Sequence, residues 1–313
     1  MRIVFMGTPD IAADSLQALL AAGHEIAGVY TREDKPVGRK QVLTPPPVKV
    51  LAQEAGLSVF QPRTLREEGA AAALAALQPD IVVVVAYGRL LPPDVLAVPK
   101  YGCVNLHVSL LPKYRGAAPV QWAVINGDAE TGVTVMQLDD GLDTGPILSQ
   151  ELIEIGPDET AGELFEKVST RGAALLCRTL REIEAGTIVP KPQQGEAGYA
   201  PPLQKELARF DFARPAVQLY NLARGCSPWP LAWFMHEGKR VKLAETGLQS
   251  NWLPAAPGTV LSVNPLVVAC AEGAVALCRV VPEGARPMTG AEWAAGRRFT
   301  PGFVLGAGQA DGY

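Results

Sequence analysis

Two polar side chains at the end of a strand-like run, Asn105 and His107, are spaced to act together. Side chains two residues apart on a strand point to the same face, so these two share one face. An amide donates hydrogen bonds to oxygen atoms, and an imidazole gains or loses a proton near neutral pH. A polar pair of this kind at a strand end is therefore a candidate for catalysis.

Two loops follow this pair. The first, 109–116, contains Pro112 and closes with a glycine, and the second, 139–145, is acidic, glycine-punctuated and contains Asp143. The chain has three histidines, and only His107 combines a polar amide on its own face with an acidic loop after the next strand-like run. A lone histidine is often structural, and an aspartate in such a loop often forms an Asx-turn. The residues alone leave catalytic and structural roles open.

The elements that position these residues alternate between strand and helix. Short apolar runs predict strands at 2–6, 24–31, 58–60, 81–86, 102–108 and 132–138. Helical patterns lie between Pro9 and Gly23 and at 47–56, 64–77 and 160–185, with Thr64 and Glu67 spaced as a capping box. This alternation predicts an α/β fold with a doubly wound, mostly parallel, Rossmann-like sheet. Such sheets bind ligands at the carboxyl ends of their strands, where Asn105 and His107 lie.

The chain changes character after a segment, 186–202, with four prolines and three glycines. A helix is expected at 215–224, and β-type runs follow at 260–263, 266–270 and 275–281, separated by turn residues. These runs predict a small antiparallel β domain, a sandwich or a barrel. We expect a first domain over residues 1–188, a linker over 189–204 and a second domain over 205–313.

Composition and charge exclude several classes of protein. Of the 313 residues, 48% are hydrophobic and 19% are charged, so the chain is expected to fold. The formal net charge of −4 divides into −7 for residues 1–204 and +3 for the remainder. Five scattered cysteines without a CxxC pair predict reduced thiols in the cytoplasm and no metal site. The apolar runs at 2–6 and 81–87 are too short for a secretory signal or a membrane span.

The first strand ends in Gly7-Thr8-Pro9-Asp10, which lacks the second and third glycines of G-x-G-x-x-G. Without them, the backbone cannot closely approach a pyrophosphate. The sequence also contains no G-x-x-x-x-G-K-[ST] motif. A nicotinamide cofactor and a nucleoside triphosphate are therefore not expected.

The residues around the polar pair carry a family resemblance. The run N-L-H-V-S-L-L-P-K-Y-R-G-A-A-P at 105–119, followed by L-D-T-G-P at 142–146, resembles the formyltransferases that use 10-formyltetrahydrofolate. Four further motifs are similar to the methionyl-tRNA formyltransferase family, in the same order and over nearly the whole chain: F-M-G-T-P-D at 5–10, D-K-P-V-G-R at 34–39, P-V-K-V at 47–50 and P-W-P at 228–230.

The resemblance implies a reaction in which the α-amine of methionyl-initiator-tRNA attacks the formyl group of 10-formyltetrahydrofolate. Asn105 would donate to the formyl oxygen, and His107 would donate to the oxyanion or handle the proton. Asp143 would orient and stabilise the imidazolium or accept the amine proton through water. By the same resemblance, the folate site is lined by Ser109, Leu110, Leu111 and Pro112. The family needs neither a metal nor a covalent enzyme intermediate.

The resemblance also implies how RNA is held. The long connection at 32–49 would contact the acceptor end of the tRNA, chiefly through Arg39 and with Lys40 beside it. The second domain resembles an OB-like β-barrel that holds tRNA through backbone charge, with Lys205 as one contact. Trp229, Trp233 and Phe234 would either stack on bases or pack in the protein. A monomer suffices for this activity, and no membrane partner is implied.

Two other interpretations are consistent with parts of the sequence. A formyltransferase acting on a small amine, such as a sugar nucleotide, would share Asn105, His107 and Asp143 but would not need the 32–49 connection or a basic second domain. A non-catalytic RNA- or folate-binding protein could retain the fold, although the presence of all three polar residues argues against it.

Overall fold

The computed structural model describes residues 1–38, 40–252 and 254–306. The chain divides into two compact units. Unit 1 consists of Met1–Pro119, Thr131–Glu154 and Phe165–Ala200, and unit 2 consists of Val120–Glu130, Ile155–Leu164 and the chain from Pro201 onward.

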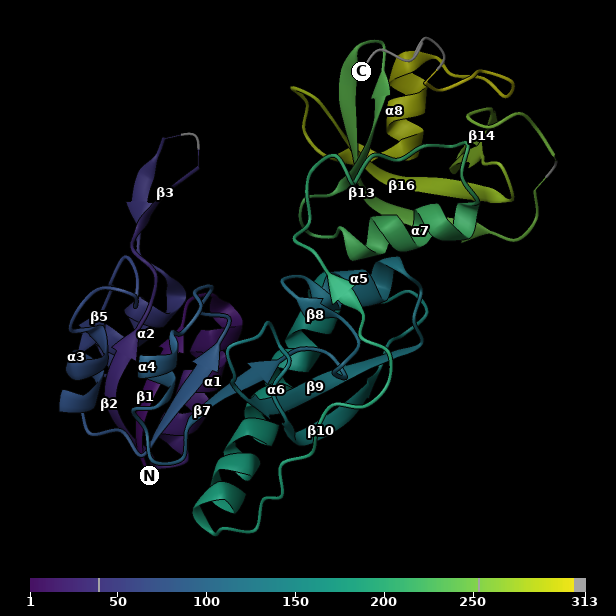
Figure 1. The fold of residues 1–313 in the computed structure, drawn as a ribbon. Coiled ribbons are helices and arrows are strands. Elements are labelled where there is room, and N and C mark those ends of the chain that lie inside the picture. Colours follow the sequence, from purple (N-terminus) through teal and green to yellow (C-terminus); the bar gives the residue numbers. More distant parts are fainter. Residues whose placement is uncertain (39, 253, 307–313) are drawn as a thin grey trace. The chain divides into compact units, whose positions relative to one another are not determined.

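Unit 1 is built on a seven-stranded sheet with the order β10-β9-β7-β6-β1-β2-β5 (Figure 1). Its strands are β1 (Arg2–Gly7), β2 (Glu25–Tyr30), β5 (Val59–Phe60), β6 (Ile81–Val85), β7 (Cys103–His107), β9 (Glu130–Gln137) and β10 (Ile147–Glu154). The strands from β5 to β7 pair in parallel, whereas β9 runs antiparallel to β7. The predicted mostly parallel α/β fold is confirmed, and β10 is a strand that the sequence did not predict.

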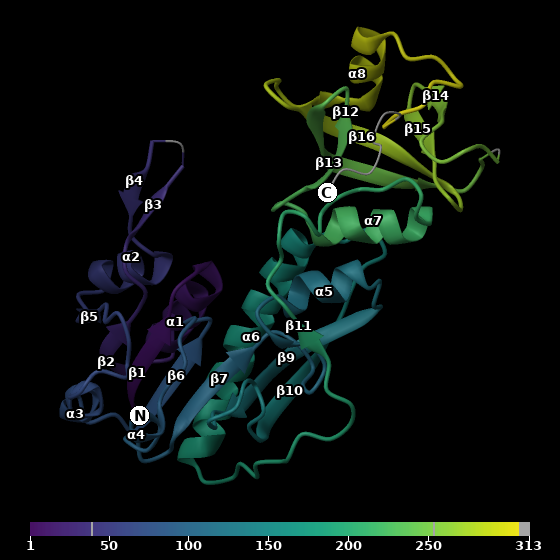
Figure 2. The same cartoon turned by 45° about the horizontal axis from the view of Figure 1, so that its top comes forward.

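The helices are α1 (Asp10–Ala21), α2 (Pro47–Glu54), α3 (Ala70–Ala76), α4 (Pro93–Leu96), α5 (Pro119–Ile125) and α6 (Ala161–Glu184). The residues of β1 and β6 are almost all buried, as expected for inner strands of a parallel sheet that helices cover on both faces. Because β1, β6 and β7 pair in parallel, their carboxyl ends meet at one edge of the sheet, beside one another in Figure 2.

The predicted capping box at 64–67 is wrong. The hydroxyl of Thr64 accepts a hydrogen bond from the backbone N–H of Arg66 at 3.1 Å, so it closes a local turn instead of capping a helix. Helix α3 begins only at Ala70, after Gly69 at a φ of 87°. This left-handed backbone interrupts the helix that the composition of 64–77 suggested, because a right-handed helix cannot pass through it.

Two segments expected as loops carry regular structure. The connection at 32–49 contains a hairpin of β3 (Lys35–Val37) and β4 (Val42–Thr44), with all six strand residues exposed. The proline-rich segment at 186–202 contains β11 (Tyr199–Ala200), which pairs in parallel with β8 (Arg115–Gly116). Lys191 also forms an antiparallel bridge to Ile147, so residues 191–200 are hydrogen bonded to the rest of unit 1.

Unit 2 is centred on an antiparallel sheet with the order β12-β13-β16-β15-β14, to which β17 adds beside β16. Its elements are α7 (Ala216–Gly225), β12 (Ala232–His236), β13 (Lys239–Gln249), β14 (Val260–Val263), β15 (Leu266–Ala269), β16 (Ala274–Pro282), β17 (Met288–Thr289) and α8 (Gly290–Arg297). The predicted strands in 260–281 are confirmed, whereas β12 and β13 were not predicted. Edge-to-face contacts of Phe212 and Trp293 with Phe234 fill the core of this unit.

Helices of the described residues are all too short or too polar to cross a membrane.

Candidate active site

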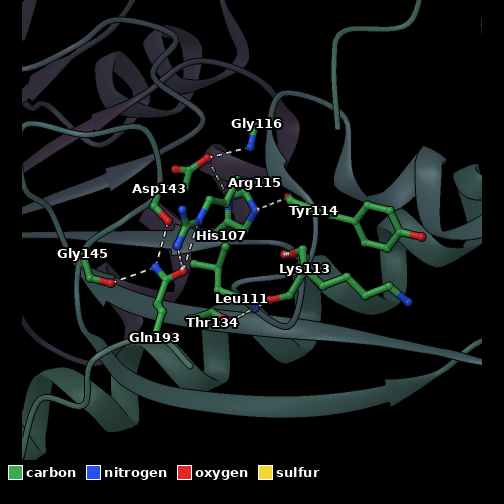
Figure 3. A network of polar contacts seen from close by, with 11 residues as sticks. His107, Leu111, Lys113, Tyr114, Arg115, Gly116, Thr134, Asp143, Gly145 and Gln193 are labelled. Carbon is green, nitrogen blue, oxygen red and sulfur yellow. Dashed lines mark hydrogen bonds and ion pairs between the residues drawn. The ribbon is translucent and has the colours of Figure 1, made fainter. Parts of the chain in front are cut away.

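His107 ends strand β7, and its imidazole is held in a single orientation. The side chain is buried, and Nε2 lies 2.9 Å from the backbone oxygen of Tyr114 (Figure 3). A carbonyl oxygen can only accept a hydrogen bond, so Nε2 carries the hydrogen and donates it. In the neutral ring, Nδ1 is consequently the nitrogen that retains a lone pair.

Asp143 lies on the Nδ1 side of this ring. Its Oδ2 is 3.7 Å from Nδ1 of His107 and accepts a hydrogen bond of 2.8 Å from the backbone N–H of Gly116. Both side chains are largely buried, with exposed fractions of 7% for His107 and 13% for Asp143. A distance of 3.7 Å is longer than a direct hydrogen bond but short enough for strong attraction between a carboxylate and an imidazolium.

The loop that carries Asp143 is closed by hydrogen bonds within it. The Oδ1 atom of Asp139 accepts bonds from the backbone N–H of Gly141 at 3.1 Å and from the hydroxyl of Thr144 at 2.8 Å. Asp143 itself has a φ of 51°, in the left-handed region that aspartate tolerates better than most residues with a side chain. A Cβ atom at Gly145 would overlap the carbonyl oxygen of Gln137, so only glycine fits there.

Asn105 lies two residues before His107 on β7, opposite Val84 on one side and Met136 on the other. It is 9% exposed, and the strand geometry places its side chain on the same face as that of His107. The structure thus brings His107 and Asp143 together and places Asn105 beside them. Their roles in a reaction remain predictions.

The predicted folate loop is braced from the neighbouring strands. The Ser109 side chain is fully buried and donates to the backbone oxygen of Lys113 at 2.6 Å. The hydroxyl of Thr134 donates to the Ser109 carbonyl at 2.6 Å, and the amide of Gln150 donates to the carbonyl of Leu111 at 3.0 Å. Sequence reasoning missed Thr134 and Gln150, because they come from β9 and β10.

The apolar residues of the same loop also have structural neighbours. Leu111 is 4% exposed, and Leu110 packs so closely against Gly132 that a Cβ there would overlap it. The backbone oxygen of Pro112 accepts a hydrogen bond of 3.1 Å from the N–H of Gly198. Contact of these residues with folate is still a prediction, and the structure gives them a part in the framework of the site.

One further residue of this site lies in the segment expected as a linker. The side-chain amide of Gln193 accepts two bonds from the guanidinium of Arg115 and donates to the backbone oxygens of Asp143 and Gly145 (Figure 3). No sequence signal pointed to Gln193, since residues 186–202 show no periodicity.

A second group of polar residues lies at the same edge of the sheet. The hydroxyl of Tyr87 is buried without a hydrogen-bond partner, and burial raises the pKa of Tyr87 to about 12, so the hydroxyl remains a donor at neutral pH. The Nε atoms of Arg32 and Arg89 are also buried without partners. These three donors are inaccessible to solvent, and Tyr87 packs in the apolar core of unit 1 beyond the end of β6.

Of the three predicted RNA contacts, one lies in unit 1, one lies in unit 2 and one lies outside the described residues. Lys40 is exposed next to the β3–β4 hairpin, and Arg39 lies outside the described residues. Lys205 is exposed in unit 2, where its backbone oxygen accepts a bond of 2.8 Å from the indole of Trp233.

The three aromatic residues considered for base stacking differ in exposure. Phe234 is 3% exposed and packs in the core, so stacking by Phe234 is wrong. Trp229 is 59% exposed. The face of Trp233 is covered by the guanidinium of Arg240, 4.0 Å from the ring centroid.

Over residues 1–38, 40–252 and 254–306, no group of three or more His, Cys, Asp or Glu residues is placed to hold a metal ion.

The chain matches known protein families over most of its length. Residues 1–180 match the model of the formyl transferase family, and residues 202–298 match that of the formyl transferase C-terminal domain. The chain is 48% identical over 313 residues to a methionyl-tRNA formyltransferase of Ectopseudomonas mendocina, covering 98% of each chain. It is 44% identical over 311 residues to that of Pelotomaculum thermopropionicum, covering 98% of this chain and 99% of the relative.

Among solved structures, HypX from Aquifex aeolicus in complex with tetrahydrofolic acid shares the fold, with a TM-score of 0.64 at 18% identity. The match covers 94% of this chain and 47% of HypX, so the chain spans about half the length of that protein. Because the chain is 44% and 48% identical to these two relatives over nearly their full length, it belongs to the methionyl-tRNA formyltransferase family.

Proposed function

We propose that the protein transfers the formyl group of 10-formyltetrahydrofolate to the α-amine of methionyl-initiator-tRNA, giving N-formylmethionyl-tRNA for translation initiation. The observation that carries the mechanism is the pairing of His107 Nδ1 with Asp143 Oδ2 at 3.7 Å, with Asn105 on the same strand face. These groups lie at the carboxyl edge of the sheet, where α/β proteins bind their ligands.

The reaction begins when the amine nitrogen attacks the formyl carbon. A nitrogen–carbon bond forms, the carbonyl electron pair moves to oxygen, and a tetrahedral intermediate results. When the intermediate collapses, the bond from the formyl carbon to N10 of the folate breaks, and its electron pair returns to N10. One proton must leave the attacking nitrogen and one must reach N10, so a single group that accepts and then donates a proton serves both steps.

His107 can serve as that group through Nδ1. Because Nε2 already donates to the Tyr114 carbonyl, Nδ1 holds the lone pair that accepts a proton. The imidazolium formed in this way lies beside the Asp143 carboxylate, which stabilises it. Of the two roles that the sequence left open for His107, this geometry favours the proton carrier over the oxyanion donor.

Asn105 then supplies the hydrogen bond to the developing oxyanion. Removing one such donor typically lowers the rate by about 10²–10³-fold. The loop with Ser109, Leu110, Leu111 and Pro112 borders the folate. This chemistry is completed without a metal or a nicotinamide.

The RNA would be held by charge from both units. Arg39 and Lys40 would contact the acceptor end, and Lys205 would contact the phosphate backbone from unit 2. We expect the protein to act as a monomer in the cytoplasm.

A direct assay tests this proposal. The protein is incubated with 10-formyltetrahydrofolate and, in parallel, with methionyl-initiator-tRNA, a nucleotide-linked amino sugar or glycinamide ribonucleotide. Formylmethionine on the tRNA is the expected product. Transfer only to a small amine would instead show a small-molecule formyltransferase. Binding of tRNA or folate without any transfer would show a non-catalytic protein.

A further inference from the structure

The side-chain amide of Gln193 lies between the two loops that meet at Asp143. Its Oε1 accepts bonds from Nε and Nη2 of Arg115, at 3.1 and 2.6 Å. Its Nε2 donates to the backbone oxygens of Asp143 and Gly145, at 2.8 and 2.9 Å. Both ends of one side chain are thus engaged, each in two hydrogen bonds (Figure 3).

These bonds reach both anchors of the Asp143 carboxylate. The first anchor is the backbone of Asp143 itself, whose carbonyl oxygen is bound by Gln193. The second is the N–H of Gly116, which donates to Oδ2 and follows Arg115, the residue bound by the other end of Gln193. The amide therefore links the loop that carries the carboxylate to the loop that holds it.

Gln193 is itself fixed by the strands around it. Two residues earlier, Lys191 exchanges backbone hydrogen bonds with Ile147, and a few residues later β11 pairs with β8. Its side chain therefore cannot follow the Asp143 loop freely if that loop moves. Asp143 has a left-handed backbone, with a φ of 51°, and the bond from Gln193 to its carbonyl is one of the contacts that hold this turn.

An amide suits this position better than a carboxylate. It offers an acceptor to Arg115 and a donor to two carbonyl oxygens, whereas a carboxylate offers only acceptors. It also adds no negative charge beside Asp143, so the Asp143 carboxylate is the anion that faces His107.

We propose that Gln193 is a positioning residue for formyl transfer, which holds the Asp143 carboxylate where it stabilises the imidazolium of His107. This inference rests on the proposed function. Gln193 contacts neither the reacting atoms nor His107, and acts through the backbone of Asp143 and through Arg115. Because displacement of a catalytic group by about 1 Å can lower a rate about 100-fold, loss of Gln193 is expected to lower kcat by about 10- to 100-fold.

Two substitutions distinguish the bonds made by Oε1 of Gln193 from those made by its Nε2. Q193A removes all four bonds, whereas Q193E keeps acceptors for Arg115 and places oxygen against the carbonyls of Asp143 and Gly145. If positioning of Asp143 is the role, both variants lose kcat, while KM for methionyl-tRNA and for 10-formyltetrahydrofolate stays near the wild-type values. The matched control is Q194A, since Gln194 is the exposed neighbour of the same type, and it should retain wild-type kcat.

A spectroscopic readout reports on His107 directly. The chain has three histidines, so imidazole nitrogen resonances are few, and those of His107 can be assigned by their absence in H107N. In Q193A and Q193E, the Nδ1 resonance of His107 should shift, while those of His24 and His236 stay in place. A role limited to folding would not produce this pattern.

The outcomes distinguish the two proposals. If the wild-type protein transfers no formyl group, the proposed function fails. If the wild type is active and Q193A retains its kcat, the positioning role alone is wrong. If Q193A and Q193E both lose the thermal unfolding transition of the wild type, Gln193 serves folding, and the positioning role is also wrong.

Discussion

Replacement of Asp143 by asparagine removes the negative charge beside His107 and keeps the shape of the side chain. The amide introduced by D143N retains an oxygen that can accept the N–H of Gly116, so the loop is expected to keep its position. The change therefore isolates the electrostatic contribution of the carboxylate to the imidazolium that forms during proton transfer.

The magnitude follows from the distance between the charges. At the 3.7 Å that separates Nδ1 of His107 from Oδ2 of Asp143, a full ion pair at an effective dielectric constant of about 20 is worth about 4 kcal/mol. Each factor of ten in rate corresponds to about 1.4 kcal/mol, so kcat should fall about a thousandfold at most. Both side chains are largely buried, so added salt should change this ratio little.

The assay is single-turnover formylation of methionyl-tRNA at saturating 10-formyltetrahydrofolate, with the wild type and D143N compared at the same pH. D140N is the matched control, because Asp140 is an exposed carboxylate in the same loop and should not change the rate. A D143N rate equal to that of the wild type would refute the assignment of Asp143 to imidazolium stabilisation. Equal losses in D143N and D140N would point to the net charge of the loop instead.

Three further changes test other parts of the structure. Gly145→Ala should destabilise the protein by about 1–3 kcal/mol in urea unfolding, because its Cβ would overlap the carbonyl oxygen of Gln137; an unchanged midpoint would contradict the geometry of this turn. Thr289→Ala removes the capping box with Glu292 at the start of α8 and should cost about 1 kcal/mol of stability, measured in the same way; wild-type stability would show that the cap contributes nothing. Arg39→Ala should raise KM for methionyl-tRNA and leave KM for 10-formyltetrahydrofolate unchanged, whereas equal effects on both would contradict the assignment of Arg39 to RNA.

Several elements could be predicted from the sequence because their signals are local. The β-branched run at 81–86 predicts a buried central strand, and β6 is one. The two-residue spacing of Asn105 and His107 is enough to place them on one face of β7. The family motifs around them and at 142–146 then single out Asp143, which the structure places beside His107.

Other features depend on pairing between distant segments, which no local pattern encodes. The antiparallel direction of β9 is set by its register with β7, and β10 exists as a strand because it pairs at the edge of the sheet. The predicted helix start at Thr64 failed because the chain turns at Gly69, which composition alone did not reveal.

The sequence by itself determined the α/β class, the family and the three polar residues of the candidate site, since these follow from periodicity, spacing and contiguous motifs. Only the tertiary structure decided which nitrogen of His107 keeps the lone pair in the neutral ring, because that depends on the carbonyl of Tyr114 reaching Nε2. It also decided that Gln193 belongs to the site. Gln193 lies 50 residues from Asp143 in the chain, and hydrogen bonds over such a separation form only once the fold has brought both segments together.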